Sequence, residues 1–215
     1  TIGFSPENYP EDPYRLDKPG LIPEGFVMAI EGRKGEQGEE WGVPTVESYE
    51  ELDPACEKRT LDFIRKNAKA NKPFFVEYWP NLLSFIKPRP KKVTQSGGAI
   101  AEEMQGLDAF MGELMKELKT LGVEENTLVV AMADNGPMVH NPPPGWGMLD
   151  LMYRGGKGDF LEGGVRVPAF AMWPGVIEKG QTVGDIVHVT DLYTTFARLA
   201  GAKKHIPGDR VIDGI

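Results

Sequence analysis

The segment from Thr127 to Gly175 constrains the fold and chemistry of this chain more than any other stretch. It begins with a continuous apolar run, from Thr127 to Ala133, that is long enough for one strand and too short for a helix. An apolar run without polar alternation is typical of a strand buried on both faces, as in a parallel sheet. A second apolar run, from Val165 to Trp173, predicts another strand near the end of the segment.

The first apolar run ends at a cluster of turn-forming residues that carries an acid and an amide. Asp134 and Asn135 are followed directly by Gly136 and Pro137. Open α/β sheets bind their ligands at the carboxyl ends of strands, so this pair lies where a ligand is expected. Carboxylate and amide oxygens are hard donors that suit calcium or magnesium. The residues alone leave one alternative open, a turn in which both side chains bond to their own backbone.

A glycine-rich turn surrounds a lysine farther along the segment. The sequence from Arg154 to Gly158 places Lys157 between glycines, which let the backbone bend tightly and bring the ammonium close to an anion. The alternative is an ordinary solvated loop lysine. We interpret Glu162 and Arg166, just beyond this turn, as a partly buried structural ion pair.

Together, the motifs of this segment resemble those of the sulfatases, especially bacterial arylsulfatases, within the alkaline-phosphatase-like superfamily. The motifs, in order, are Asp134-Asn135-Gly136, Gly156-Lys157-Gly158, Glu162-Gly163-Gly164-x-Arg166-x-Pro168 and Trp173-Pro174-Gly175. The resemblance implies sulfuric ester hydrolysis, with a sulfate ester small molecule or a sulfated glycan as the substrate. It implies that Asp134 and Asn135 are metal ligands for calcium, or alternatively magnesium. It also implies that Lys157 is a catalytic residue, which binds the sulfate ester and stabilises charge on the leaving oxygen.

The resemblance covers most of residues 49–215 and implies that other parts of the site lie outside this chain. In the family, the nucleophile is a formylglycine made from Cys or Ser in a C/S-x-P/A-x-R motif on an earlier segment, where two further metal-ligating acids also lie. Cys56 lacks that context, because Lys58 and Thr60 stand at the two motif positions, so we interpret it as a half-buried helical cysteine. Formylglycine is therefore not encoded here, and the missing N-terminal part of the same enzyme is an expected partner.

A second departure from the family concerns the histidine that contacts the sulfate group. By counting from Pro73, that position falls on Ser84, which we predict as a weaker substrate-binding residue. A serine can hydrogen-bond an anion but carries no charge. His140 lies in a proline-rich loop without ligand spacing, and we interpret His188 as a core histidine. The run from Met138 to Met152 is a candidate wall of the substrate pocket.

Composition excludes several classes of function. The chain has 215 residues and a net charge of -8, which argues against a nucleic-acid partner. It contains no apolar run long enough for a transmembrane helix, so we expect no membrane partner. The chain begins with Thr1 and no signal-peptide pattern follows, so we expect a processed or excised chain. The residues do not determine a compartment, and the resemblance is compatible with a periplasmic or secreted protein.

Residues 1–48 are rich in proline, glycine and charge, and we predict a loop-rich excursion with one short strand at Phe26–Ile30. Residues 49–215 are predicted to be the downstream part of a sulfatase-like α/β catalytic domain. Helices are predicted at 46–70, with Ser48 as its N-cap, at 101–121 and after Thr190 or Asp191. Strands are predicted at 74–79 and 186–189, besides the two apolar runs.

This alternation predicts an α/β layered sandwich, with a largely parallel or mixed sheet flanked by helices. By resemblance, the sandwich is a partial alkaline-phosphatase-like fold. Two other functions remain open at this point: a phosphate or phosphonate ester hydrolase of the same superfamily, and a non-catalytic remnant of the fold.

Overall fold

The computed structural model describes residues 29–32, 35, 37–41, 46–80, 98–137, 139 and 152–214. The chain divides into two units, Thr1–Ile177 and Glu178–Ile215, which are described separately below. The elements of the first unit are β1 (Ala29–Glu31), β2 (Glu39–Trp41), α1 (Val46–Lys69), α2 (Gly98–Thr120), η2 (Glu124–Asn126), β3 (Val129–Met132), α3 (Glu162–Val165) and β4 (Ala169–Met172). The second unit contains α4 (Val189–Leu199) and η3 (Lys203–His205).

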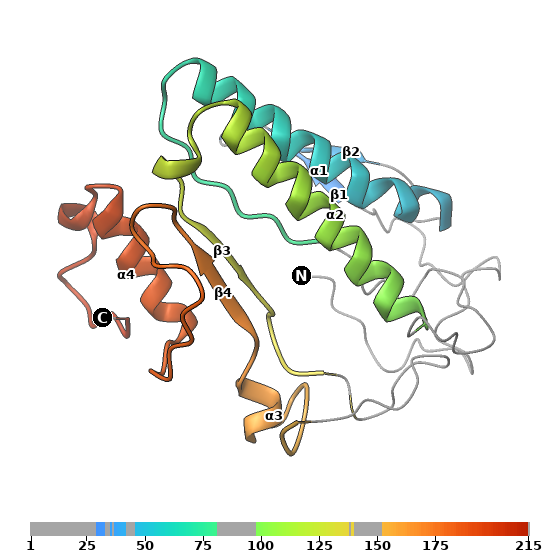
Figure 1. Cartoon of the computed structure of the whole chain (residues 1–215), viewed down its shortest axis with the longest axis vertical. Coiled ribbons are helices and arrows are strands. Elements are labelled where there is room, and N and C mark those ends of the chain that lie inside the picture. Colours follow the sequence, from blue (N-terminus) through green and yellow to red (C-terminus); the bar gives the residue numbers. More distant parts are fainter. Residues whose placement is uncertain are drawn as a thin grey trace. The chain divides into compact units, whose positions relative to one another are not determined.

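Helices α1 and α2 form the core of the first unit. Figure 1 shows the two helices side by side and running in the same direction. Among the described residues, the buried apolar side chains lie on these helices, namely Leu61, Ile64, Phe110 and Leu118. Their spacing of three or eight residues within each helix places each pair on one face. The predicted helices at 46–70 and 101–121 are therefore confirmed, but Ser48 is not the N-cap, because α1 begins at Val46.

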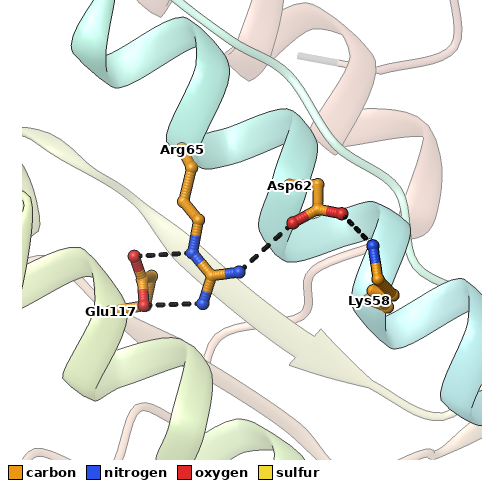
Figure 2. Close-up of polar contacts among 4 residues, drawn as sticks. All are labelled: Lys58, Asp62, Arg65 and Glu117. Atoms are coloured by element: carbon orange, nitrogen blue, oxygen red, sulfur yellow. Dashed lines mark hydrogen bonds and ion pairs between the residues drawn. The ribbon is translucent and has the colours of Figure 1, made fainter.

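A chain of ion pairs connects α1 to α2 (Figure 2). The Nε and Nη2 atoms of Arg65 donate to the two carboxylate oxygens of Glu117, each at 2.9 Å. Asp62 accepts from Arg65 at 3.2 Å and from Lys58 at 2.6 Å. The two-point contact fixes one guanidinium plane against one carboxylate and so joins α1 to α2 in one defined geometry. The hydrogen bonds from Arg65 hold the pKa of Glu117 below its usual value.

Residues 72–80, after α1, have no regular secondary structure, so the strand predicted at Phe74–Trp79 is not present in the described residues. A strand requires a hydrogen-bonded neighbour, and the apolar pattern of one segment cannot show whether the chain supplies one. Tyr78 anchors this segment to both helices instead. Its hydroxyl donates to Glu57 at 3.4 Å, and its ring lies 4.8 Å from that of Phe110. Burial is the main cause that raises the pKa of Tyr78 above its ordinary range.

Residues with positive φ end the helices. Gly122 follows α2 with φ +69°, and the amide of Val123 donates to Leu118 O at 3.0 Å. Gly201 plays the same part after α4, with φ +68°. Glycine suits both helix ends, because a residue without Cβ adopts this conformation at little cost. Asn71 ends α1 in the same conformation, with φ 51°.

Strands β3 and β4 pair antiparallel, with Val129 opposite Met172 and Met132 opposite Ala169. Both predicted apolar strands are thus present, although shorter than the apolar runs. The burial on both faces expected for the first run is wrong, because in β3 Val129 to Ala131 are half-buried and Met132 is exposed. All four residues of β4 are exposed. Apolar composition reports which surface a strand can bury, whereas burial depends on the elements that cover it.

The other described pair, β1 with β2, is also antiparallel. The prediction of a short strand at Phe26–Ile30 is met at Ala29 and Ile30, and the rest lies outside the described residues. Helices and small sheets together confirm the α/β class. Neither described pair is parallel, so the described residues do not show a largely parallel sheet. In this part of the chain, no helix is both long and apolar enough to cross a membrane.

In the second unit, α4 begins one or two residues before the predicted caps. His188 is the N-cap: its Nδ1 accepts from the amide of Thr190 at 3.3 Å, while Asp191 Oδ2 accepts from the amide of His188 at 2.8 Å. His188 is exposed and is not a core histidine. Residues 186–188 have no regular secondary structure and Val189 begins α4, which corrects the strand predicted at 186–189. Lys203–His205 forms the short η3 helix.

Candidate functional site

Backbone hydrogen bonds join the loop after β3 to the segment before β4. The amide of Ala133 donates to Pro168 O at 3.1 Å, which extends the contacts of the strand pair by one step. Beyond it, the amide of Gly136 donates to Gly164 O at 3.0 Å. Asp134 and Asn135 therefore lie just beyond the end of β3, between two backbone hydrogen bonds that the residues on either side of them make to the segment before β4.

Lys157 lies in a closed turn that touches the same loop. The amide of Asp159 donates to Gly156 O at 2.9 Å, and Gly158 has φ +91°, which fits the third position of a type II turn. The amide of Lys157 donates to Pro137 O at 2.7 Å. Because Pro137 follows Asn135 by two residues, the backbone of the lysine turn meets the backbone of the acid–amide loop. The fold thus brings the Asp134–Asn135 motif and the Lys157 turn into contact.

Glycines make this close approach possible. A Cβ at Gly136 would overlap the carbonyl oxygen of Gly163, and one at Gly156 would overlap that of Pro137. A Cβ at Gly164 would overlap the carbonyl oxygen of Asp159. In each case the obstacle is backbone rather than a flexible side chain. We call the glycines 136, 156, 163 and 164 the glycine joint; backbones that lie this close leave no room for any other residue.

The three predicted functional side chains differ in exposure. Asp134 and Lys157 are exposed and Asn135 is half-buried. In the described residues, no group of three or more His, Cys, Asp or Glu side chains is placed to hold a metal. Asp134 and Asn135 fit calcium or magnesium by their oxygen donors, but they offer only two side chains where calcium takes about six to eight oxygens. Their role as ligands, and that of Lys157 toward a sulfate ester, stays a prediction.

The predicted ion pair between Glu162 and Arg166 is present, with Nε and Oε2 2.7 Å apart. It is not partly buried as expected, because 58% of each side chain is exposed. Arg166 also donates to the hydroxyl of Tyr153 at 3.2 Å and lies over its ring, 4.9 Å from the centroid. The hydrogen bond to Tyr153, and then the charge of Glu162, raise the pKa of Arg166. These contacts support the structural role, because they join Tyr153, which precedes the turn with Lys157, to Arg166, which follows it.

Other candidates are placed only in part. Cys56 is half-buried within α1, as expected. Ser84 and His140 lie outside the described residues, as does most of the candidate pocket wall at Met138–Met152. The sequence interpretation missed Asp159, whose carboxylate Oδ2 accepts from the amide of Gly156 at 2.8 Å. The signal was present, since an acid three residues after a turn residue is well placed to bond its backbone.

A family model described as Sulfatase matches residues 31–202 of the chain. Among curated proteins, the chain is 36% identical to the rat (Rattus norvegicus) steryl-sulfatase over 176 residues, which are 77% of this chain and 29% of that protein. It is 34% identical to the dog (Canis lupus familiaris) N-acetylgalactosamine-6-sulfatase over 161 residues, and this match covers 74% of this chain and 30% of that protein.

Solved structures give the same result. The structure resembles the PsFucS1 sulfatase from Pseudoalteromonas sp. with a TM-score of 0.73 and 31% identity, over 91% of this chain and 38% of that one. It resembles Ps i-CgsB, solved in complex with k-i-k-neocarrahexaose, with a TM-score of 0.59 and 28% identity, over 75% and 36% of the two chains. This chain therefore spans only about a third of the length of these proteins.

Proposed function

The chain belongs to the sulfatase family, and from this premise we propose that it supplies part of the metal and sulfate site of a sulfuric ester hydrolase. One observation carries the proposal: the amide of Lys157 donates to Pro137 O at 2.7 Å, which joins the lysine turn to the Asp134–Asn135 loop. A cation beside a pair of hard oxygen ligands suits an anionic ester. The net charge of -8 makes this local attraction necessary, because the overall field opposes an anionic substrate.

Each residue has a separate task in this proposal. The oxygens of Asp134 and Asn135 would hold calcium, with magnesium as the alternative, and the ion would polarise the sulfuryl oxygens when bound. The ammonium of Lys157 would stabilise the negative charge that develops on the leaving ester oxygen. Ser84 would add a weaker hydrogen bond to the sulfate group. The chain contains no residue that fits the formylglycine nucleophile, since no Cys or Ser stands in the C/S-x-P/A-x-R motif.

The remaining parts of the site would come from the N-terminal part of the same enzyme. The substrate would be a sulfate ester small molecule or a sulfated glycan. The names of the relatives refer to both steryl and sugar sulfates, so they support the reaction class rather than one substrate. In the complete fold, β3 and β4 would belong to a larger, largely parallel or mixed sheet flanked by helices, as in a layered alkaline-phosphatase-like sandwich.

The first test is Lys157→Ala in a protein that contains this chain together with the N-terminal part. Turnover of 4-nitrophenyl sulfate should fall about a hundred- to a thousandfold, because one charge-stabilising donor is lost. Lys116→Ala is the matched control, since Lys116 is an exposed lysine on α2 and should leave turnover unchanged. Full turnover by Lys157→Ala would contradict the site assignment. Parallel assays with 4-nitrophenyl phosphate distinguish a sulfatase from a phosphatase.

A further inference from the structure

Asp159 closes the turn that carries Lys157. Its amide donates to Gly156 O at 2.9 Å, and its carboxylate Oδ2 accepts from the amide of Gly156 at 2.8 Å. The two residues thus bond to each other in both directions, with only Lys157 and Gly158 between them. A turn closed from both sides is more rigid than a turn held by the single backbone hydrogen bond.

The turn would be unusually mobile without this closure. Gly155 and Gly158, on either side of Lys157, have φ +86° and +91°, a conformation that glycine enters and leaves readily. Gly156 itself is buried, so loss of the carboxylate would leave its amide without that acceptor in a place with little access to water. The side chain of Asp159 therefore restricts the backbone of a turn that Gly155, Gly156 and Gly158 would otherwise make flexible.

The charge of Asp159 argues that its contribution is geometric. A carboxylate two residues from Lys157 lowers the positive potential that an anionic sulfate ester needs. If attraction of the substrate were its role, a neutral or basic residue would serve better at this position. The acceptor oxygen, rather than the negative charge, is the property that the turn uses.

We propose that Asp159 is a positioning residue that fixes the backbone of Lys157, so that the ammonium meets the leaving oxygen of a sulfate ester. The inference rests on the proposed function of Lys157. Asp159 makes no contact with the substrate and acts only through the lysine turn. Because a displacement of about 1 Å in a reacting group can cost about a hundredfold in rate, the loss of this bond should appear mainly in kcat.

The experiment compares four variants of the protein that contains this chain and the N-terminal part: Asp159→Ala, Asp159→Asn, Lys157→Ala and the double variant Lys157→Ala/Asp159→Ala. Asp159→Ala should lower kcat for 4-nitrophenyl sulfate by about ten- to a hundredfold, with a smaller change in KM. The kcat of Asp159→Asn should stay within about threefold of that of the parent, because the amide oxygen of asparagine can accept the same hydrogen bond. The double variant should be no slower than Lys157→Ala, because Asp159 has nothing left to position.

Three outcomes would overturn the proposal. Equal losses in Asp159→Asn and Asp159→Ala would show that the charge matters. Where Asp159→Ala fails to fold, a kcat of folded Asp159→Asn far below that of the parent would overturn the proposal in the same way. Parent-like kcat in Asp159→Ala would show that the closure is not needed. A further loss in the double variant, by the same factor as in Asp159→Ala alone, would show a role independent of Lys157. Full activity of Lys157→Ala would instead refute the proposed function, which separates the two failures.

Discussion

At the scale of single residues, the glycine joint determines how closely the two loops of the candidate site approach each other. Gly136, Gly156 and Gly164 each face a backbone carbonyl at a distance that no Cβ could occupy. Backbone cannot swing aside as the end of a flexible side chain can. The amide of Gly136 is also committed, because it donates to Gly164 O at 3.0 Å.

We therefore expect Gly136→Ala to lower the free energy of unfolding by about 1–3 kcal/mol, as over-packing of a filled site does. Urea denaturation of the parent and the variant measures this change. The control is Gly112→Ala, because Gly112 lies within α2 with open space around it. That change should raise the free energy of unfolding by about 0.5–1 kcal/mol, since alanine favours a helix. Equal stability of Gly136→Ala and the parent would contradict the close packing of the loops.

At the scale of elements, two glutamates on the helix pair have pKa values shifted in opposite directions. Hydrogen bonds from Arg65 lower the pKa of Glu117 on α2. Burial, as the largest cause, raises the pKa of Glu57 on α1, although the hydrogen bond from Tyr78 opposes this. The stability that Glu117 contributes is present above its unfolded pKa and is lost as the pH falls through its folded value. The stability that Glu57 contributes depends on pH in the opposite sense, because burial favours its protonated form. That stability is present below the unfolded pKa of Glu57 and is lost as the pH rises through its folded pKa.

The expected pH dependence of the helix pair follows from these signs. Glu117→Gln should lower stability at pH 7, and the deficit should shrink as the pH falls below 4.5, where the parent also loses the charged pair. Urea midpoints between pH 3 and pH 7 measure the difference. Asp209→Asn is the control, since Asp209 pairs with Arg210 in an exposed position and should contribute little. A deficit that stays constant over this range would show that the carboxylate charge of Glu117 is not linked to stability.

Elements differ in how far the sequence could predict them. Helices α1, α2 and α4 follow from a local period of 3.6 residues, and their ends follow from residues such as Gly122 and Gly201 that accept positive φ. Strands depend on partners distant in the chain. The segments at 74–79 and 186–188 carry strand-like sequence patterns, yet among the described residues they have no strand partner. His188 was missed as a cap because serine, threonine, aspartate and asparagine are the usual N-cap residues.

The candidate site could also be predicted from the sequence only in part. The motifs located Asp134, Asn135 and Lys157, because turn formers and glycines mark loops by local chemistry. What the sequence could not show is the contact between the loops, such as the hydrogen bond from Lys157 to Pro137 O. That contact depends on the register of β3 against β4, which places the ends of the two strands together.

At the scale of the whole molecule, the chain leaves large apolar side chains uncovered. Phe160 is 99% exposed and Ile186 is 97% exposed. Single exposed apolar side chains are normal, but neighbouring ones, such as Phe160 with Leu161 and Ile186 with Val187, mark a surface that another element or a partner covers. Exposure on this scale is expected of a part of a larger fold, and the chain spans 29–38% of the relatives described above. The division at residue 48 between a loop-rich excursion and the catalytic domain stays a prediction.

Calcium binding tests whether the metal site is shared between this chain and the N-terminal part of the enzyme. Calcium takes about six to eight oxygen ligands, and only Asp134 and Asn135 are assigned as ligands here. Calorimetric titration of the isolated chain with calcium should therefore show no tight site. With the N-terminal part present, a tight site should appear and weaken on Asp134→Ala, whereas Asp108→Ala, an exposed acid on α2, should have no effect. A tight, stoichiometric site in the isolated chain would mean that its own residues complete the ligand shell, and the shared site would be wrong.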